Sequence, residues 1–372
     1  MKKAELPDGV AFVHDWLNGM RGGEKCLEAL GRKWPDAPVY TLLYRPECVS
    51  EDIRRHPVEA SAMLARIPGF ASHYRNFLPL FPRAVEAFEL PEWTRLVISM
   101  SHCVAKGVRP PAGAKHLCYC FTPMRYAWGL QEEYFGRNPL KRAALAPVLA
   151  KLRSWDKASA ARVDRFVAIS EHVRRRIEAC YGRETDVVFP PVATDFYTRD
   201  PAALREDFAL VVSALVPYKR IDLAIAACRA NGKRLKIAGT GSDEKKLRAL
   251  AEGAPNITFE GRPGDEEIRA LYRTCRYLLF PGEEDFGIVP VEAQACGAPV
   301  VAFRKGGALE TIREDETGVF FGEQTPEALC EAMERADGMI FDGATIRRNA
   351  ERFTEARFLA GMEEQIRRTL EG

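Results

Sequence analysis

Long hydrophobic runs are missing from this sequence of 372 residues. No stretch approaches the roughly 20 apolar residues that a helix needs to span a bilayer. The first ten residues, MKKAELPDGV, contain two lysines but lack the apolar segment of a secretory signal. We therefore expect a soluble cytoplasmic protein without a membrane-spanning helix.

Paired cysteine motifs are also missing, although the chain has 10 cysteines. No CxxC pair occurs, and several cysteines stand in apolar, strand-like runs such as HLCYC at residues 116–120. Zinc sites and disulfide frameworks usually need regular cysteine spacing. These cysteines are therefore expected to be buried thiols.

Charge is nearly balanced, at a net +2, but it is unevenly distributed. Residues 1–191 carry 29 Lys+Arg against 21 Asp+Glu, whereas residues 192–372 carry 25 against 31. Residues 137–183 alone hold 12 basic and 4 acidic side chains, the basic ones including Lys141, Arg142, Lys151, Arg153, Lys157, Arg162, Arg165, Arg174, Arg175 and Arg176. A solvated helix face and a contact with an anionic membrane or a lipid-pyrophosphate acceptor both fit this excess. No base-reading motif accompanies it, so nucleic acid is not expected as a partner.

Short apolar runs alternate with helical patterns in both halves of the chain, which is typical of parallel, doubly wound α/β domains. The chain also exceeds the usual size of one hydrophobic core. Pro190 and Pro191 cannot continue a helix or a central strand, so we place the domain boundary there. The expected parts are a first Rossmann-like domain at 1–190, a second at 191–350 and a C-terminal helix at 351–372.

The strand and helix patterns give approximate bounds for the elements. Strands are expected at 10–14, 39–43, 96–99, 117–120 and 166–169 in the first domain, and at 208–213, 234–238, 257–259, 277–280 and 299–302 in the second. Helices are expected at 23–33, 140–163, 171–180, 221–230, 243–251, 266–273 and 287–296, and at 344–370 with a possible break near Phe353.

Glu284 and Glu292 stand eight residues apart in the segment PGEEDFGIVPVEAQACG, residues 281–297. The pattern indicates a buried strand, a loop with Glu284, and a helix that begins near Gly287 and carries Glu292. Open α/β sheets bind ligands beyond the carboxyl ends of their strands, where helix N–H groups favour phosphate. Carboxylates accept hydrogen bonds from paired hydroxyls, so Glu284 could hold a hexose and Glu292 a ribose. Taken alone, a solvated Glu284 and a dipole-stabilising Glu292 are the simpler interpretation.

Lys219 and Arg220, in the segment VPYKR, follow the strand expected at 208–213 and open a helix. Cations at that place can neutralise the charge that grows on a diphosphate leaving group. A basic pair on the surface is the alternative. The Gly239-Thr240-Gly241 turn also follows a strand, but without a third glycine it is a weak nucleotide signal.

The first half offers two further loops. Gly22 and Gly23 let backbone N–H groups approach a phosphate or a sugar closely, although a tight strand-to-helix turn would also need them. Arg125 and Tyr126, after a Thr-Pro pair, offer an anion contact and a stacking face. His102 follows the preceding strand and could reach the same place, but a core or surface histidine is the simpler interpretation.

Six segments, in this order, resemble the retaining GT-B glycosyltransferases of family GT4: HDWL-x5-GGE, YCFTPMRYAW, SEHVRRRI, VPYKRID, the two-glutamate segment and GGALETI. The sequence is most similar to the O-antigen mannosyltransferase subgroup, which acts in lipopolysaccharide synthesis. The resemblance implies a GT-B fold of two Rossmann-like domains that face a central cleft. It also implies that the C-terminal helix crosses back to the first domain.

The resemblance implies a role for each matching residue. Lys219 is expected to stabilise the leaving group and Glu284 to orient the hexose, so both are expected to be catalytic. The expected donor-binding residues are Arg220, Gly241, Arg262, Phe286, Gly287, Ile288, Glu292 and Gly306, and the expected acceptor or phosphate loops hold Gly22, Gly23, Arg125 and Tyr126. Two positions depart from the family pattern: Ala214 stands where relatives often have arginine, and Phe121 where they have a histidine that contacts the transferred sugar.

The implied reaction is a retaining, metal-independent hexosyl transfer that needs no cofactor. No DxD motif occurs, and the glutamate pair is placed to bind hydroxyls rather than a metal. The implied donor is GDP-mannose, with UDP- and dTDP-sugars as alternatives. The implied acceptor is an undecaprenyl-pyrophosphate-linked oligosaccharide at the cytoplasmic face of the inner membrane. A non-catalytic sugar-nucleotide or glycan-binding subunit is the rival from another class, and a GT-B epimerase would need an acid/base cluster that the first half does not show.

Overall fold

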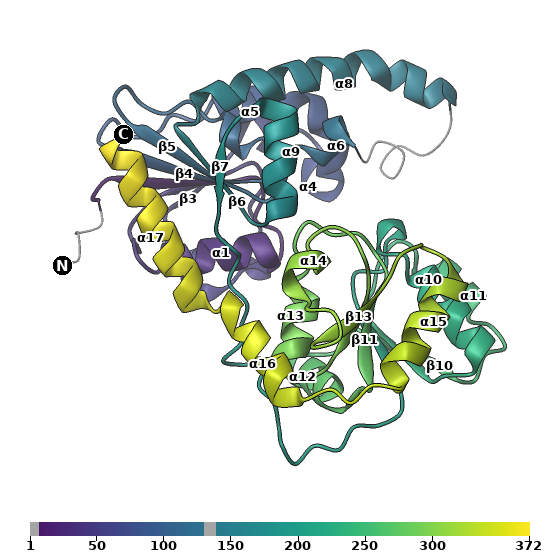
Figure 1. Ribbon diagram of the computed structural model, residues 1–372. Coiled ribbons are helices and arrows are strands. Elements are labelled where there is room, and N and C mark those ends of the chain that lie inside the picture. Colours follow the sequence, from purple (N-terminus) through teal and green to yellow (C-terminus); the bar gives the residue numbers. More distant parts are fainter. Residues whose placement is uncertain (1–6, 130–138) are drawn as a thin grey trace, which may run out of the picture. The chain divides into compact units, whose positions relative to one another are not determined.

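The computed structural model describes residues 7–129 and 139–372, and it describes side chains from residue 143 onward in the second range. The chain divides into two compact units (Figure 1). Unit 1 comprises Met1–Pro191 together with Glu355–Gly372, and unit 2 comprises Val192–Thr354. Within the described ranges, no helix has the length and apolar character needed to cross a membrane.

Unit 1 contains a parallel sheet of seven strands in the order β3-β2-β1-β4-β5-β6-β7. The strands are β1 (Val10–His14), β2 (Val39–Thr41), β3 (Val58–Ala60), β4 (Leu96–Ser101), β5 (Lys115–Cys120), β6 (Arg165–Ala168) and β7 (Thr185–Val187). The central strands are buried along their whole length, as in parallel sheets that helices cover on both faces. The order reverses between β1 and β4, so the loops that follow these two strands meet at the carboxyl edge.

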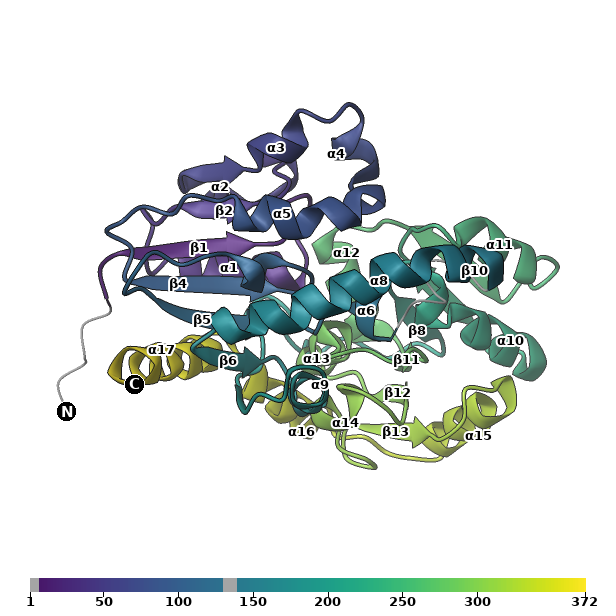
Figure 2. The same ribbon diagram turned by 90° about the horizontal axis from the view of Figure 1, so that it is seen from above.

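The helices of unit 1 include one long element, α8, which crosses the view in Figure 2. They are α1 (Gly22–Gly31), α2 (Glu51–Arg55), α3 (Ala62–Ala65), α4 (Phe70–His73), α5 (Phe81–Glu86), α6 (Arg125–Trp128), α8 (Pro139–Ser159), α9 (Glu171–Tyr181) and α17 (Glu355–Glu371), with short 3-10 turns η1 (Pro46–Cys48), η2 (Tyr74–Leu80), η3 (Ala105–Gly107) and η4 (Ala160–Arg162).

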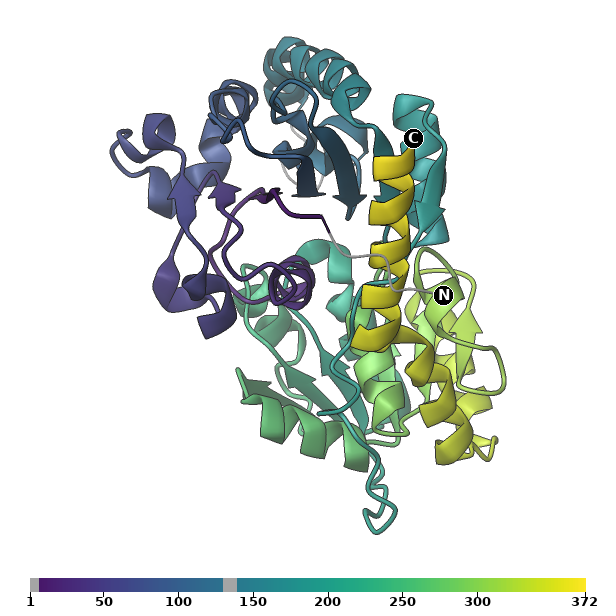
Figure 3. The ribbon, with the colours of Figure 1, turned by 90° about the vertical axis from the view of Figure 1, so that its left-hand side faces the viewer.

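The C-terminal helix α17 packs on the first domain, as the resemblance to GT-B enzymes implies (Figure 3). The Phe358 ring lies 5.5 Å from the Tyr119 ring of β5. Ion pairs join the end of α1 to the same helix, with Arg32 and Glu355 at 2.6 Å and Lys33 and Glu363 at 2.9 Å. These contacts make α17 part of unit 1 although it follows unit 2 in the sequence.

Unit 2 contains six parallel strands in the order β10-β9-β8-β11-β12-β13, the strand order of a dinucleotide-binding fold. The strands are β8 (Ala209–Val212), β9 (Leu235–Ala238), β10 (Ile257–Gly261), β11 (Tyr277–Phe280), β12 (Val300–Phe303) and β13 (Gly318–Phe321). The order reverses between β8 and β11, which pair with Tyr277 beside Ala209 and Leu278 beside Leu210. The loops after β8 and β11 therefore meet at the carboxyl edge of this sheet.

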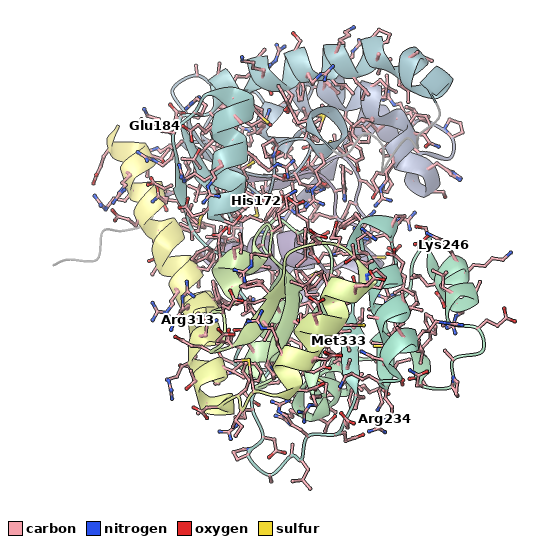
Figure 4. All side chains as sticks on the ribbon, turned by 45° about the vertical axis from the view of Figure 1, so that its right-hand side comes forward. His172, Glu184, Arg234, Lys246, Arg313 and Met333 are labelled. Atoms are coloured by element: carbon pink, nitrogen blue, oxygen red, sulfur yellow. The ribbon has the colours of Figure 1, made fainter. Side chains whose placement is uncertain are left out.

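The helices of unit 2 cover both faces of its sheet. They are α10 (Ile221–Asn231), α11 (Glu244–Leu250), α12 (Asp265–Thr274), α13 (Ile288–Ala295), α14 (Ala308–Thr311), α15 (Pro326–Asp337) and α16 (Gly343–Ala350), with 3-10 turns η5 (Pro217–Lys219) and η6 (Glu351–Phe353). Met333 of α15 is fully buried in the core, whereas Lys246 projects from α11 into solvent (Figure 4).

The two parallel sheets confirm the predicted class of two Rossmann-like doubly wound domains. Three strands were not predicted: β3, β7 and β13. The first two are three-residue edge strands with half-buried or exposed side chains, so they leave no apolar run in the sequence. β13 is fully buried, and its segment GVFF is an apolar run of the kind that indicates a strand.

Candidate functional site

Lys219 and Glu284 form an ion pair at the reversal point of the unit 2 sheet. Lys219 ends η5, which follows β8, and Glu284 lies in the loop after β11. Their side chains are 16% and 20% exposed, so both are largely enclosed but reachable from solvent. One cation and one carboxylate thus stand side by side at the edge where open α/β sheets bind ligands.

Gly282 brings these two loops together, although the sequence analysis did not single it out. A Cβ at this position would lie 2.9 Å from the Cα of Lys219 and 2.9 Å from the carbonyl oxygen of Tyr218. No side chain fits at that distance. The glycine therefore lets the loop after β11 pass directly against η5, which explains why Lys219 and Glu284 meet.

Gly306 and Gly307 support the Glu284 loop from the other side. The N–H of Gly307 donates to the carbonyl oxygen of Glu284 at 2.8 Å. A Cβ at Gly307 would overlap the backbone of Phe286, and one at Gly306, whose φ is +69°, would overlap the Glu284 carbonyl. The turn that opens α14 thus holds the backbone on which Glu284 stands.

Arg220 has its own partner in unit 2. Its φ of +54° lies in the left-handed region, which is uncommon for a residue with a side chain. Its guanidinium contacts the Asp222 carboxylate at 3.1 Å and the amide oxygen of Gln324 at 3.5 Å. Ala214 brings no charge to this loop. The expected role of Arg220 in donor binding stays a prediction.

Helix α13 carries Glu292 in its second turn, as the sequence predicts, and starts directly after Gly287, whose φ is +89°. The buried Tyr272 hydroxyl donates to the Glu292 carboxylate at 3.0 Å. Phe286 is 3% exposed and packs 5.4 Å from the Phe353 ring, so its side chain belongs to the core. Ile288 is half-buried in the first turn of the helix.

Gly241 and Arg262 lie on the neighbouring loops. A Cβ at Gly241 would overlap the carbonyl group of Leu215, so the loop after β9 packs against the loop after β8. The N–H of Gly239 donates to the carbonyl of Gly261 at 2.6 Å, which joins the ends of β9 and β10. Arg262 follows β10 directly and is exposed. Every donor-binding residue that the sequence analysis named therefore lies in the loops or helix starts of one sheet edge.

Asp15 organises the corresponding edge of unit 1. It is fully buried, and its two oxygens accept four backbone N–H groups: Oδ2 from His102 at 2.7 Å and Cys103 at 2.9 Å, Oδ1 from Val104 at 2.6 Å and Ala105 at 2.8 Å. Burial raises the pKa of the Asp15 carboxyl, and the donated hydrogen bonds oppose that rise. The loop after β4 is thereby wrapped around one carboxylate from the loop after β1.

Gly22 and Gly23 form the first turn of α1 rather than a loop before it, and their role at the acceptor stays a prediction. The turn is closed by Glu24, whose carboxylate accepts the N–H of Arg21 at 3.2 Å. Burial raises the pKa of Glu24 to about 7. A Cβ at Gly23 would lie 3.1 Å from Nε2 of His14, so glycine is needed where this turn crosses β1.

Arg125 and Tyr126 begin α6, where Arg125 is half-buried and Tyr126 is 9% exposed. The pKa of His102 is lowered to about 3, first by burial and then by the charges of Arg125, Arg21 and Arg75. Three arginines therefore gather around one histidine at this edge. Arg21 and Arg75 were not among the predicted site residues, because they are far apart in the sequence: Arg21 precedes α1 and Arg75 lies in η2.

A buried ion pair anchors the same region. Lys106, which is 1% exposed, contacts Asp156 of α8 at 2.8 Å, and its ammonium donates to Ser159 at 2.7 Å. The Asp156 carboxylate also accepts from Trp128 of α6 and from Tyr181 of α9, each at 2.7 Å. One buried polar network thus fixes α6, α8 and α9 to the loop after β4.

Much of the basic excess of residues 137–183 has protein partners. Arg162 contacts Glu86, Arg165 contacts Asp186 at 3.1 Å, and Arg174 contacts Glu171 at 2.6 Å. Lys151 and Lys157 are exposed on α8, and Lys141 and Arg142 lie outside the described side chains. Within the described part of the chain, no group of three or more metal-binding side chains occurs.

Residues 198–336, which lie wholly in unit 2, match the family described as Glycosyl transferases group 1. A GDP-mannose-dependent alpha-(1-6)-phosphatidylinositol monomannoside mannosyltransferase of Mycobacterium tuberculosis is 30% identical over 193 residues, 44% of this chain and 50% of that protein. An uncharacterized glycosyltransferase of Methanocaldococcus jannaschii is 27% identical over 184 residues, 49% of this chain and 52% of that protein. The chain thus spans about half the length of the curated relatives that it matches.

Among solved structures, HepE of Anabaena in complex with UDP is similar over 96% of this chain and 99% of that chain, with a TM-score of 0.69 and 17% identity. At this identity the likeness concerns the fold. It extends over both units, and it confirms the predicted GT-B class of two Rossmann-like domains.

Proposed function

We propose that this protein is a retaining, metal-independent hexosyltransferase that uses a sugar nucleotide as donor. The observation that carries the proposal is the Lys219–Glu284 pair at the reversal point of unit 2, inside the segment that matches group 1 glycosyl transferases. Lysine is the cation that a departing diphosphate needs, and glutamate is a carboxylate that can bind sugar hydroxyls.

In the proposed reaction the bond between the anomeric carbon and the phosphate oxygen breaks, and a bond to an acceptor hydroxyl oxygen forms on the same face of the sugar. The departing phosphate takes the hydroxyl proton. Lys219 stabilises the negative charge that grows on that phosphate, and Glu284 orients the hexose. N–H groups at the start of α13 add further positive potential, so Lys219 and the helix together do the work that a metal would do elsewhere.

Mannose from GDP-mannose is the proposed donor sugar. Its support is the resemblance to O-antigen mannosyltransferases, together with the 30% identity to a mycobacterial enzyme whose name includes GDP-mannose. A UDP- or dTDP-sugar is the second candidate, because HepE, similar in fold, was crystallised with UDP. A non-catalytic sugar-nucleotide-binding subunit is less well supported, because both Lys219 and Glu284 are present.

The proposed acceptor is a polyprenyl-pyrophosphate-linked glycan in surface polysaccharide or O-antigen synthesis. Its support in unit 1 is the positive charge that Arg21, Arg75 and Arg125 exert on His102, together with the start of α1 at Arg21, since guanidinium groups and helix N-termini both bind phosphate. Exposed Lys151 and Lys157 on α8 support peripheral contact with an anionic inner-membrane surface.

A thermal-shift panel tests the donor assignment. GDP-mannose, UDP-glucose, UDP-galactose and dTDP-rhamnose are each added to the full chain, with GDP, UDP and dTDP as controls. Binding to the native state raises the melting temperature, so GDP-mannose and GDP should give the largest shifts. A shift with UDP-sugars alone would replace the donor, and no shift with any nucleotide would refute the proposed function.

A further inference from the structure

His102 is held in one orientation by two contacts within unit 1. Its ring nitrogen Nδ1 lies 3.1 Å from Oδ2 of Asp15, the carboxylate that also accepts the His102 backbone N–H. Its ring stands edge-on to Trp16, with centroids 4.4 Å apart and planes at 89°. A histidine fixed on both sides in this way cannot turn to exchange its two nitrogens.

These contacts determine which nitrogen carries the proton. A carboxylate oxygen beside Nδ1 requires Nδ1–H as the donor, which leaves Nε2 with its lone pair when the ring is neutral. The ring is neutral at pH 7, because burial and the charges of Arg125, Arg21 and Arg75 lower the pKa of His102 to about 3. Nε2 of His102 is therefore a hydrogen-bond acceptor, and the side chain is 29% exposed.

His14, whose ring lies next to that of His102, also has its Nδ1 beside an oxygen atom. Nδ1 of His14 lies 3.0 Å from the carbonyl oxygen of Trp16, which can only accept, so Nδ1 again carries the proton. Burial lowers the pKa of His14 to about 4. Nε2 of His14, in a side chain that is 2% exposed, faces the backbone of Gly23 in the first turn of α1.

The Phe121 ring and the two histidine rings form a triangle, in which Phe121 lies 6.2 Å from each histidine and the histidines lie 6.3 Å apart, centroid to centroid. This is the position where the GT4 pattern has histidine and this chain has phenylalanine. The next residue, Thr122, is 3% exposed, and its hydroxyl also has no partner within the described part of the chain. Three aromatic rings and the buried Thr122 hydroxyl thus lie at the carboxyl ends of β1, β4 and β5.

We propose that His102, oriented by Asp15 and Trp16, accepts a hydrogen bond at Nε2 from a hydroxyl group of the acceptor sugar. This inference rests on the proposed function, since it names the acceptor contact of that reaction. A neutral nitrogen acceptor is suited to a hydroxyl, whereas an anion would need a donor there. His102 thus provides a sugar contact next to the position where Phe121 removes one, and the three arginines keep its lone pair available.

The first test is the protonation state of His102 in the full chain, read from its imidazole 15N signals by NMR at pH 7. Nδ1 should be protonated and Nε2 unprotonated, and addition of methyl α-D-mannopyranoside should shift the Nε2 signal. A protonated Nε2, or an Nε2 signal that the sugar does not move, would overturn the inference. This readout needs no turnover.

The second test uses a substitution to distinguish the roles of Nδ1 and Nε2 of His102. In H102N the side-chain amide can still donate to Asp15, but nothing replaces Nε2, so the fold is retained while the sugar contact is lost. With methyl α-D-mannopyranoside as acceptor, kcat/KM should fall about tenfold, as expected for one neutral hydrogen bond. H73N, at an exposed histidine of α4, is the matched control and should keep the wild-type acceptor kinetics.

The outcomes distinguish the inference from the function on which it rests. Unchanged acceptor kinetics in H102N, with normal donor hydrolysis in the wild type, would overturn the His102 assignment and leave the transferase proposal intact. A wild-type protein that hydrolyses no sugar nucleotide but still shows the sugar-dependent Nε2 shift would refute the transferase and support the contact.

Discussion

At the residue scale, each unit has a contact between two charged or polar side chains from neighbouring loops, at the equivalent place in its sheet. In unit 2, Lys219 from the loop after β8 meets Glu284 from the loop after β11. In unit 1, Asp15 from the loop after β1 meets His102 from the loop after β4. Each pair lies where the strand order reverses, which is the place where open α/β sheets bind their ligands.

Lys219→Ala should reduce kcat for transfer by about 10²- to 10³-fold, because one electrostatic contact to a developing charge contributes that much. Folding should be retained, since the side chain is not part of the core. Steady-state release of nucleoside diphosphate measures the effect. Lys305→Ala is the matched control, because Lys305 forms an ion pair with the adjacent Glu283 at 3.0 Å and is 59% exposed. Equal rates for both variants would remove Lys219 from the mechanism.

At the scale of elements, close contacts between loops place the candidate residues. Gly282, Gly306 and Gly307 each stand where a Cβ would overlap or crowd a neighbouring backbone. The turn before α14 and the loop after β11 are therefore packed backbone to backbone. A change in either turn moves Glu284 without touching it.

Gly307→Ala should destabilise unit 2 by about 1–3 kcal/mol, the usual cost of inserting a methyl group into a tightly packed place. It should also weaken donor binding, because the added Cβ displaces the backbone of Phe286 and hence Glu284. Urea unfolding and nucleotide titration measure the two effects. Gly322→Ala is the control, since a Cβ there meets nothing within 4 Å. Similar behaviour of both variants would contradict the packing argument.

The buried network around Asp156 allows a second prediction at this scale. Lys106→Met leaves the Asp156 carboxylate buried without its cation, which should lower the free energy of unfolding by about 3–5 kcal/mol. Chemical denaturation measures the change. Lys115→Met removes the cation of a partly exposed pair with Asp164 at 3.8 Å and should cost less than about 1 kcal/mol. A small effect at Lys106 would show that solvent reaches Asp156.

The elements themselves could largely be predicted from the sequence. The strands Val10–His14 and Tyr277–Phe280 have the predicted bounds, because strands buried on both faces are continuous apolar runs. The C-terminal helices are also interrupted at the predicted place, near Phe353. The short edge strands β3 and β7 could not be found in this way, since their stability comes from pairing rather than from apolar residues.

The contacts between site residues were harder to predict from the sequence than the identities of those residues. The sequence indicated Lys219 and Glu284 separately, but their ion pair depends on β8 and β11 being neighbours, which is a property of strand order. The four N–H groups on Asp15 come from residues 87 to 90 positions away, so no local pattern reveals them. His102 was assigned to core or surface for the same reason.

At the scale of the whole molecule, unit 1 holds a set of buried histidines and carboxyls that should make its stability depend on pH. Burial lowers the pKa values of His14 and His116 to about 4 and of His102 to about 3, while it raises those of Asp15 and Glu24. The histidines stabilise the fold fully above pH 6.5, and that stability is lost as pH falls toward 4. The raised pKa of Glu24, about 7, and the raised pKa of Asp15 oppose this loss. Between pH 6.5 and pH 5 all three histidines take up protons on unfolding, so we expect their effect to exceed that of the carboxyls.

Unit 1 should therefore lose stability between pH 6.5 and pH 5, by about 1.4 kcal/mol per pH unit for a net uptake of one proton on unfolding. Tryptophan fluorescence reports this unit alone, because all 5 tryptophans precede residue 192. His116→Gln removes one of the three histidines and should flatten the dependence, whereas the exposed His73→Gln should not. Stability that is independent of pH in the wild type would contradict the burial of these rings as neutral groups.

The central claim is that unit 2 activates a sugar nucleotide through Lys219 without a metal. The most direct measurement is the release of nucleoside diphosphate by the full chain, in the presence and absence of EDTA. The donors are GDP-mannose, UDP-sugars and dTDP-sugars. The account predicts turnover of at least one donor, GDP-mannose first, at a rate that EDTA does not change. Turnover that EDTA abolishes and Mg²⁺ or Mn²⁺ restores, or no turnover of any donor that binds, would contradict it.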